Sequence, residues 1–94
     1  MIQNLEERKI LRKAIDYYGC RNQMLKVVEE LAELQCELVR FLLQDGRASW
    51  PSIAEELADV EIMLSQLRMM MPEGIVCEIR KKKLERLNER LNEQ

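Results

Sequence analysis

The chain has 94 residues, of which 47% are hydrophobic, 34% charged and 4% aromatic, and its net charge is -2. This balance predicts one small folded domain over residues 1–94 with an aliphatic core, and it excludes a disordered chain and a general attraction to nucleic acid. The chain contains no histidine, so Ser-His and Cys-His nucleophilic sites are excluded and any catalysis has to use carboxylates, lysines, arginines and metal.

The cysteines and the N-terminal segment bear on the cellular compartment. Cys20, Cys36 and Cys77 are widely spaced and form no CxxC pair, which indicates neither a disulfide framework nor a zinc site. We expect them to be reduced and mostly buried. The N-terminal MIQNLEERKILRK has no apolar leader core, and no apolar run is long enough to span a bilayer. The sequence therefore predicts a cytoplasmic protein without membrane or nucleic-acid partners.

Helical periodicity without any strand signal predicts an all-α chain of four antiparallel helices. The first helix is expected from about Gln3 to Tyr18, with Gly19 ending it and Asn22 capping the next. The second, about Gln23 to Leu43, carries a broad apolar stripe that includes Val27, Leu31, Leu34, Leu38 and Phe41. Because this stripe exceeds what one short antiparallel partner would cover, we expect a homodimer or homotetramer.

The third and fourth helices differ in character. After a break over Gln44 to Arg47, Ser52 and Glu55 match the S-x-x-E capping box, and the third helix is expected to end near Met71. Its apolar stripe consists of Ile53, Leu57, Val60, Leu64 and Leu67. The fourth helix, about Ile75 to Leu91, has a thin apolar seam among many basic residues, and its interspersed glutamates indicate a solvated, salt-bridged surface.

Two acidic segments stand out, KVVEELAELQCE at 26–37 and EELADVEIML at 55–64. At about 100° per residue, Glu30 and Glu33 lie roughly 60° apart on one helix face, with Glu37 between them one turn on. Glu56 and Asp59 repeat the three-residue step. If the two helices pack side by side, four carboxylates converge on one small volume.

Such a cluster is costly unless it is protonated or neutralised by a cation. Oxygen ligands without histidine or thiolate favour Mg²⁺, with Mn²⁺ as a substitute, and so indicate phosphoryl or pyrophosphoryl chemistry. A di-iron site is set aside because it requires Glu-x-x-His pairs. Spacing alone fits an ordinary polar helix face equally well, and the repetition on two helices favours the site. Lys26 is either a local ion-pair partner or a phosphate ligand.

The acidic segments also carry a family resemblance. EELAE at Glu29–Glu33 followed by EELAD at Glu55–Asp59 resembles the EExxE and ExxD signature of the MazG-like nucleoside triphosphate pyrophosphohydrolases, a group within the all-α NTP pyrophosphatase superfamily. The similarity extends through YYGCRNQMLKVVEELAEL, ELADVEIMLSQL and KKKLERLNERL, from about Tyr17 to Leu91, and these stretches look like the compact forms common in bacteria and their phages. It implies hydrolysis between the α- and β-phosphates of an NTP or dNTP, giving a monophosphate and pyrophosphate, in nucleotide-pool control or house-cleaning.

The resemblance assigns roles residue by residue. The metal ligands are Glu30, Glu33, Glu56 and Asp59. Glu29, with Glu30 and Glu33, belongs to the catalytic set, either as a supporting acid or as the group that orients the attacking water. Lys83 and Arg90 match a lysine and arginine seven residues apart that neutralise phosphate charge. The asparagine expected between them is replaced by Leu87, with Asn88 one residue beyond, and Glu37 receives no ligand role and is placed at the rim.

Trp50 and Gln23 each fit two roles. Trp50, in the loop before the third helix, either stacks on the nucleobase of the substrate or packs as a hydrophobic plug. Gln23 either reaches the site entrance or belongs to the first turn of its helix.

Two other functions are also compatible with the sequence. One is a non-catalytic helical interaction module, such as a phage or toxin-antitoxin partner protein, whose basic last helix docks on an acidic surface or nucleic acid. The second is a degenerate family member that binds nucleotides without turnover. All four predicted metal ligands are present, which favours an active enzyme over the degenerate member.

Overall fold

The computed structural model describes residues 4–43 and 48–93, and every regular element in these ranges is an α-helix. The helices are α1 (Leu5–Tyr18), α2 (Cys20–Leu42), α3 (Trp50–Met70) and α4 (Ile75–Asn92). The all-α prediction with four helices is therefore confirmed. The predicted start at Gln3 and the predicted break over Gln44 to Arg47 lie outside the described residues.

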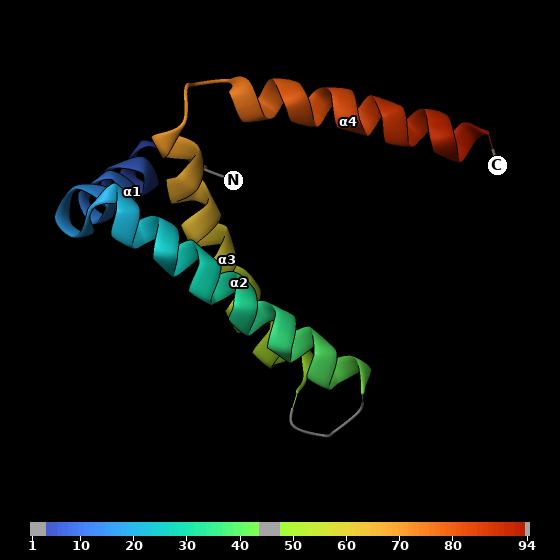
Figure 1. Ribbon diagram of the computed structural model, residues 1–94, viewed down its shortest axis with the longest axis horizontal. Helices are drawn as coiled ribbons and strands as arrows, with labels where there is room; N and C mark the ends of the chain where they lie inside the picture. Colours follow the sequence, from blue (N-terminus) through green and yellow to red (C-terminus); the bar gives the residue numbers. More distant parts are fainter. Residues whose placement is uncertain (1–3, 44–47, 94) are drawn as a thin grey trace.

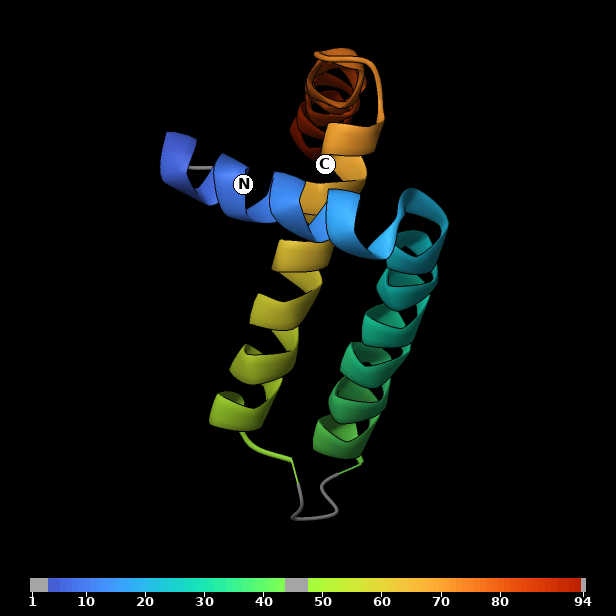
Figure 2. The same ribbon diagram turned by 90° about the vertical axis from the view of Figure 1, so that its left-hand side faces the viewer.

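Helices α2 and α3 pack side by side along most of their length, and α1 crosses one end of the pair (Figure 1 and Figure 2). Their antiparallel direction follows from two contacts. At one end the buried Gln23 side-chain amide donates a hydrogen bond to Gln66 Oε1 at 2.7 Å, and at the other end the rings of Phe41 and Trp50 lie 4.8 Å apart. The predicted antiparallel packing is thus present in this pair.

The start of α2 differs from the sequence prediction. Gly19 has a φ of +91°, which a residue with a Cβ rarely adopts, and this single residue separates α1 from α2. Because the chain turns in one residue, α2 begins at Cys20, and the predicted Asn22 cap is wrong. Asn22 instead lies in the first turn of α2, where its side chain donates to the Tyr18 carbonyl at 2.8 Å.

The capping box of α3 also lies earlier than predicted. Ser49 is extended, its Oγ accepts from the Ser52 backbone N–H at 3.3 Å, and its own N–H donates to Ser52 Oγ at 2.8 Å. With Pro51 preset for the first turn, the helix starts at Trp50, so Ser52 is the third helical residue and Glu55 is not part of the cap.

The core is small, and it lies where α1 meets α2 and α3 and along the α2–α3 contact. Its buried hydrophobic residues are Leu11, Ile15, Val27, Ile53, Val60 and Met63. The α2–α3 contact is partly polar, since Gln23, Glu30, Ser65 and Gln66 are also buried. Leu31, Leu38 and Leu57, which belong to the predicted apolar stripes, are exposed because each helix turns a neighbouring, partly polar face inward. The three cysteines are free as expected, but all are exposed, so their predicted burial is wrong.

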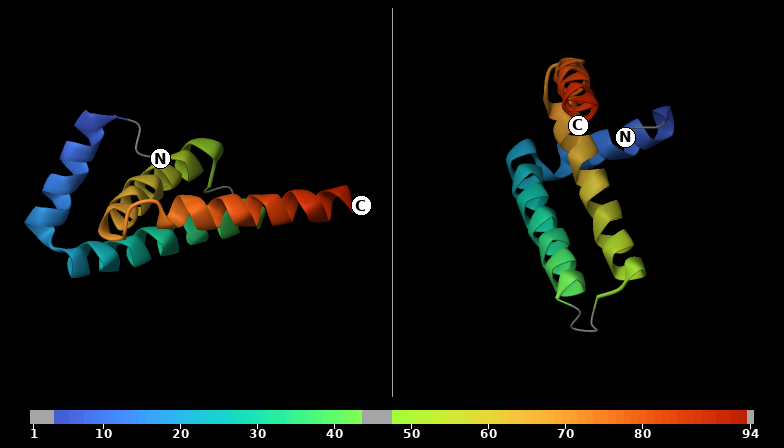
Figure 3. Two further views of the ribbon diagram at one scale, coloured as in Figure 1. Left: turned by 90° about the horizontal axis from the view of Figure 1, so that it is seen from above. Right: turned by 90° about the vertical axis from the view of Figure 1, so that its right-hand side faces the viewer.

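Helix α4 stands apart from the other three. It follows Gly74, whose φ is +84°, and it extends away from the end of α3 without sustained packing against α1, α2 or α3 (Figure 1 and Figure 3). No residue of α4 is buried, including its apolar residues Ile79, Leu84, Leu87 and Leu91. The radius of gyration is 16.2 Å, against about 12 Å for a compact domain of this length. None of the helices in the described ranges has the length and apolar character that a membrane span requires.

Candidate carboxylate site

Glu30 is the centre of the candidate site because it is the most deeply buried acid of α2. It follows Val27 by three residues, so both lie on the helix face that packs against α3. Only 9% of its side chain is exposed. The charge of a buried carboxylate has to be compensated by nearby cations or hydrogen-bond donors, and one such partner lies on the same helix.

Lys26, one turn before Glu30, supplies that compensation on one side. Its Nζ lies 3.3 Å from Glu30 Oε1 and 3.5 Å from Glu29 Oε1. The hydrogen bond to Glu30 is the main reason that the pKa of Lys26 is raised, with the charge of Glu29 next. Of the two roles that the sequence allows for Lys26, the ion pair is the one present in the structure.

The antiparallel packing brings Glu56 of α3 to Glu30 and Glu33 of α2. One ligand atom from each of these three carboxylates lies within 4.8 Å of the other two. The charge of Glu30 is the largest cause of a raised pKa at Glu33, followed by desolvation and by the charges of Glu56 and Glu29. The group therefore repels itself and favours an added proton or cation.

Two oxygens of this cluster are unpartnered. Glu30 Oε2 and Glu56 Oε2 are buried and accept no hydrogen bond from any described residue. A buried carboxylate oxygen without a donor carries a desolvation cost. The arrangement is chemically able to hold one hard divalent cation, which accepts oxygen ligands from several carboxylates at once.

The other predicted site residues lie outside this cluster. Asp59, one turn along α3 from Glu56, is exposed and is not among the three gathered carboxylates. Glu29 is also exposed and pairs with Lys26.

The remaining predicted substrate-binding residues also lie outside the cluster. Trp50 lies at the Phe41 end of the helix pair, where its ring packs against Phe41 while 70% of the residue stays exposed. Lys83 and Arg90 are exposed residues of α4, which has no sustained packing against α2 or α3.

Glu37 corrects the sequence interpretation, which places it at a solvated rim. Only 14% of its side chain is exposed, Arg40 Nη1 contacts its Oε1 at 3.0 Å, and its Oε2 is buried without a hydrogen bond from a described residue. Helical spacing groups Glu37 with Glu30 and Glu33 on one face of α2, but spacing alone does not say that α3 covers this face, and the resemblance assigns Glu37 no role.

Gln23 lies in the α2–α3 contact, where it is bonded to Gln66. It therefore does more than complete the first turn of α2. Gln66 is a buried polar residue that the sequence interpretation does not identify, because nothing in its spacing separates it from the exposed polar residues of α3.

In comparisons with known proteins, no protein-family model, no curated protein and no solved structure matches the chain.

Proposed function

We propose that this chain is a Mg²⁺-dependent nucleoside triphosphate pyrophosphohydrolase of the MazG-like type. The observation that carries the proposal is the cluster of Glu30, Glu33 and Glu56, drawn from two helices with ligand atoms within 4.8 Å. The acidic motifs that resemble this family occupy the same two helices. The reaction would give a nucleoside monophosphate and pyrophosphate.

The residues fit a hard cation on chemical grounds. All three donors are carboxylates, and the unpartnered oxygens of Glu30 and Glu56 have free lone pairs for a metal ion. Mg²⁺ suits this donor set, and Mn²⁺ is the expected substitute. A bound Mg²⁺ would hold substrate phosphates and lower the pKa of a coordinated water.

Each nearby side chain has a task within this proposal. Lys26 holds the Glu30 carboxylate through Oε1, which leaves Oε2 for the metal. Asp59 is exposed one turn from Glu56 and would complete the ligand set after a side-chain rotation. Glu29 is the candidate for orienting the attacking water, since it is exposed beside Glu30 and bound on one oxygen by Lys26.

Lys83 and Arg90 are proposed to act between two copies of the chain. Because α4 has no sustained packing against α2 or α3 of its own chain, these cations are proposed to serve the carboxylates of a second copy in a homodimer or homotetramer. The chain exposes 7697 Å², about 2,000 Å² more than the roughly 5,700 Å² expected for a folded monomer of 11.2 kDa. An excess of this size matches an obligate oligomer interface. Leu87→Glu on the exposed face of α4 is expected to reduce the particle mass in light scattering, and an unchanged mass would contradict this arrangement.

The rival function is a non-catalytic interaction module. It is favoured by α4 itself, an exposed helix with an apolar seam and many basic residues that no described part of the chain covers. A binding module, however, has no need for three carboxylates on two facing helices. Hydrolysis of a nucleotide is expected of the enzyme and not of the interaction module.

The test is release of pyrophosphate from a panel of NTPs and dNTPs with Mg²⁺. Glu33→Gln and Asp59→Asn are expected to abolish release while the helical circular dichroism is retained. Glu55→Gln is the matched control, because Glu55 is an exposed acid of the same α3 segment outside the cluster. Full activity of Glu33→Gln or Asp59→Asn would contradict the role given to that residue, and no turnover of any substrate by the wild type would favour the interaction module.

A further inference from the structure

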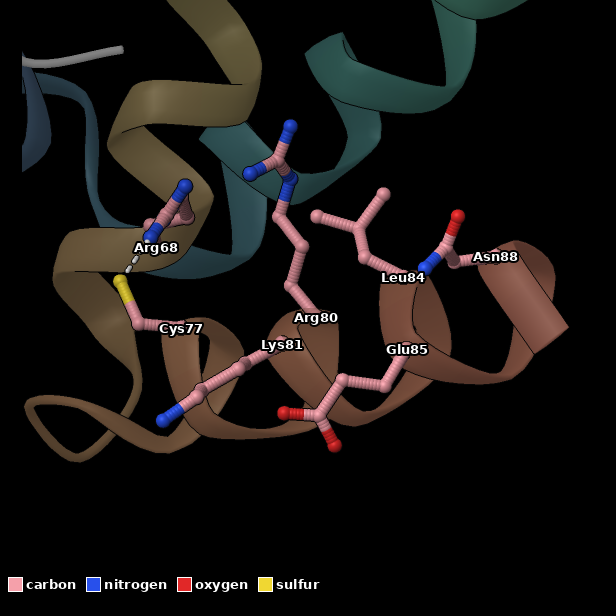
Figure 4. Close-up of a pocket in the computed structure, with 7 residues that line it drawn as sticks. All are labelled: Arg68, Cys77, Arg80, Lys81, Leu84, Glu85 and Asn88. Carbon is pink, nitrogen blue, oxygen red and sulfur yellow. Dashed lines mark hydrogen bonds between the residues drawn. The ribbon is translucent and has the colours of Figure 1, made fainter.

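A cavity of about 530 Å³ lies between the C-terminal end of α3 and one face of α4 (Figure 4). Arg68 from α3 lines it together with six residues of α4: Cys77, Arg80, Lys81, Leu84, Glu85 and Asn88. The α4 residues share one side of the helix because they recur at three- and four-residue steps. Its volume falls in the range of about 300–1,000 Å³ typical of small-molecule sites.

The charge of this cavity is strongly positive for an acidic chain. Arg68, Arg80 and Lys81 face it with Glu85 as the only acid of its lining, and none of the three cations forms an ion pair with a carboxylate in residues 4–43 or 48–93. Arg68 uses one N–H, donated from Nη2 to Cys77 Sγ at 2.8 Å, and this contact fixes its guanidinium beside α4 (Figure 4). Its other donors have no partner among the described residues.

A second cavity of about 510 Å³ continues the same surface, since Arg68 and Cys77 line both. It adds Arg8 from α1 and Glu73 from the α3–α4 connection. The two cavities together present four cations and two carboxylates, in a chain whose net charge is -2. Positive charge is therefore concentrated here against the overall sign of the protein.

We propose that the Arg68–Arg80 cavity is a binding site for a pyrophosphate group, either free or carried by a nucleotide. Two guanidinium groups match phosphate oxygens with paired N–H donors, and Lys81 and the Asn88 amide add further donors. The lining has three cations and one carboxylate, so a ligand with a single carboxylate would balance only half of the net positive charge, whereas pyrophosphate carries several negative charges in a small volume.

This site is separate from the carboxylate cluster. Arg68 follows Glu56 by twelve residues of the same helix, which is roughly 18 Å along its axis. Lys83 and Arg90 lie on the opposite side of α4 from the cavity lining, at about 100° per residue. The site therefore does not depend on the proposed hydrolase chemistry, and it is tested without metal.

The first experiment is calorimetric titration of the full chain with inorganic pyrophosphate in EDTA at low salt. The wild type is expected to bind one pyrophosphate per chain, and Arg80→Gln and Arg68→Gln/Arg80→Gln are expected to lose about tenfold in affinity for each arginine removed. The side chain of Arg80 forms no hydrogen bond or ion pair with a described residue, so Arg80→Gln tests the site without removing a structural contact. Arg21→Gln, an exposed arginine of α2 that lines neither cavity, is the matched control and should bind like the wild type.

The second experiment locates the ligand with the exposed cysteines. Pyrophosphate is expected to slow alkylation of Cys77, which lines both cavities, and to leave Cys36 on α2 unaffected. A nucleoside diphosphate that protects Cys77 at lower concentration than pyrophosphate would assign the nucleotide-borne source, and the reverse order the free one. The proposal is overturned by absent binding, by equal affinity of the wild type and the double variant, or by an oligonucleotide that binds more tightly than either compound.

Discussion

Replacement of Glu56 by glutamine is expected to raise the stability of the metal-free protein and to lower its response to Mg²⁺. Ligand atoms of Glu56 and Glu30 lie within 4.8 Å, and two unit charges at that distance repel by about 3.5 kcal/mol at the effective dielectric of a protein surface. Lys26 neutralises part of the Glu30 charge. A glutamine would remove one negative charge and offer its amide N–H to the unpartnered Glu30 Oε2.

After allowance for Lys26 and solvent, we expect a gain of about 1–2 kcal/mol without metal, or about 4–8 °C in melting temperature for each kcal/mol. Millimolar Mg²⁺ should stabilise the wild type by about 2.7 kcal/mol if its concentration is 100 times the dissociation constant, and it should stabilise the variant far less. The order of stability of the two proteins should therefore reverse when Mg²⁺ replaces EDTA.

The assay is thermal unfolding by far-ultraviolet circular dichroism in EDTA and in Mg²⁺, with Glu55→Gln as the control from the same helix. The control should melt like the wild type in both buffers. The reasoning is refuted if Glu56→Gln is destabilised in EDTA, because the carboxylate then has a stabilising partner. An unchanged Mg²⁺ response would also refute it.

Three further predictions concern pH, core polarity and assembly. The pKa of Glu33 is raised above its ordinary 4.5, so the folded state binds this proton more tightly than the unfolded state. The stability of the metal-free protein should therefore fall as pH rises from about 4.5 through the raised pKa. Melting temperatures measured over this pH range should change less for Glu33→Gln than for the wild type. Gln66→Leu leaves the buried Gln23 amide without its hydrogen-bond partner and should lower the free energy of unfolding, measured in denaturant, by about 1–3 kcal/mol. The double variant Gln23→Leu/Gln66→Leu should recover most of that free energy. Because α4 has no buried residue within its own chain and is proposed to pack on a second copy, removal of residues 75–94 is expected to lower both the particle mass and the melting temperature, and unchanged values would contradict that arrangement.

The helices are predictable because apolar spacing and turn residues are local signals. The same is true of the grouping of Glu30 and Glu33, which follows from the helix repeat, and the antiparallel packing then brings Glu56 to them. The inward rotation of α2 is not predictable in this way, because it depends on which face α3 covers, and it buries Glu37 while exposing Leu31. The direction of α4 is set by the turn at Gly74, so the cavity between Arg68 and α4 leaves no signal in the spacing of residues.

The buried hydrogen bond between Gln23 and Gln66 has a consequence for fold specificity that differs from its contribution to stability. Apolar side chains tolerate sliding of one helix along another, but a slide of one turn would leave both amides buried without partners. Only one alignment of α2 and α3 satisfies the pair, and it is the alignment that places Glu56 beside Glu30. A Gln23→Leu/Gln66→Leu protein could therefore remain folded and still lose its metal response, because the helices would be free to occupy several registers.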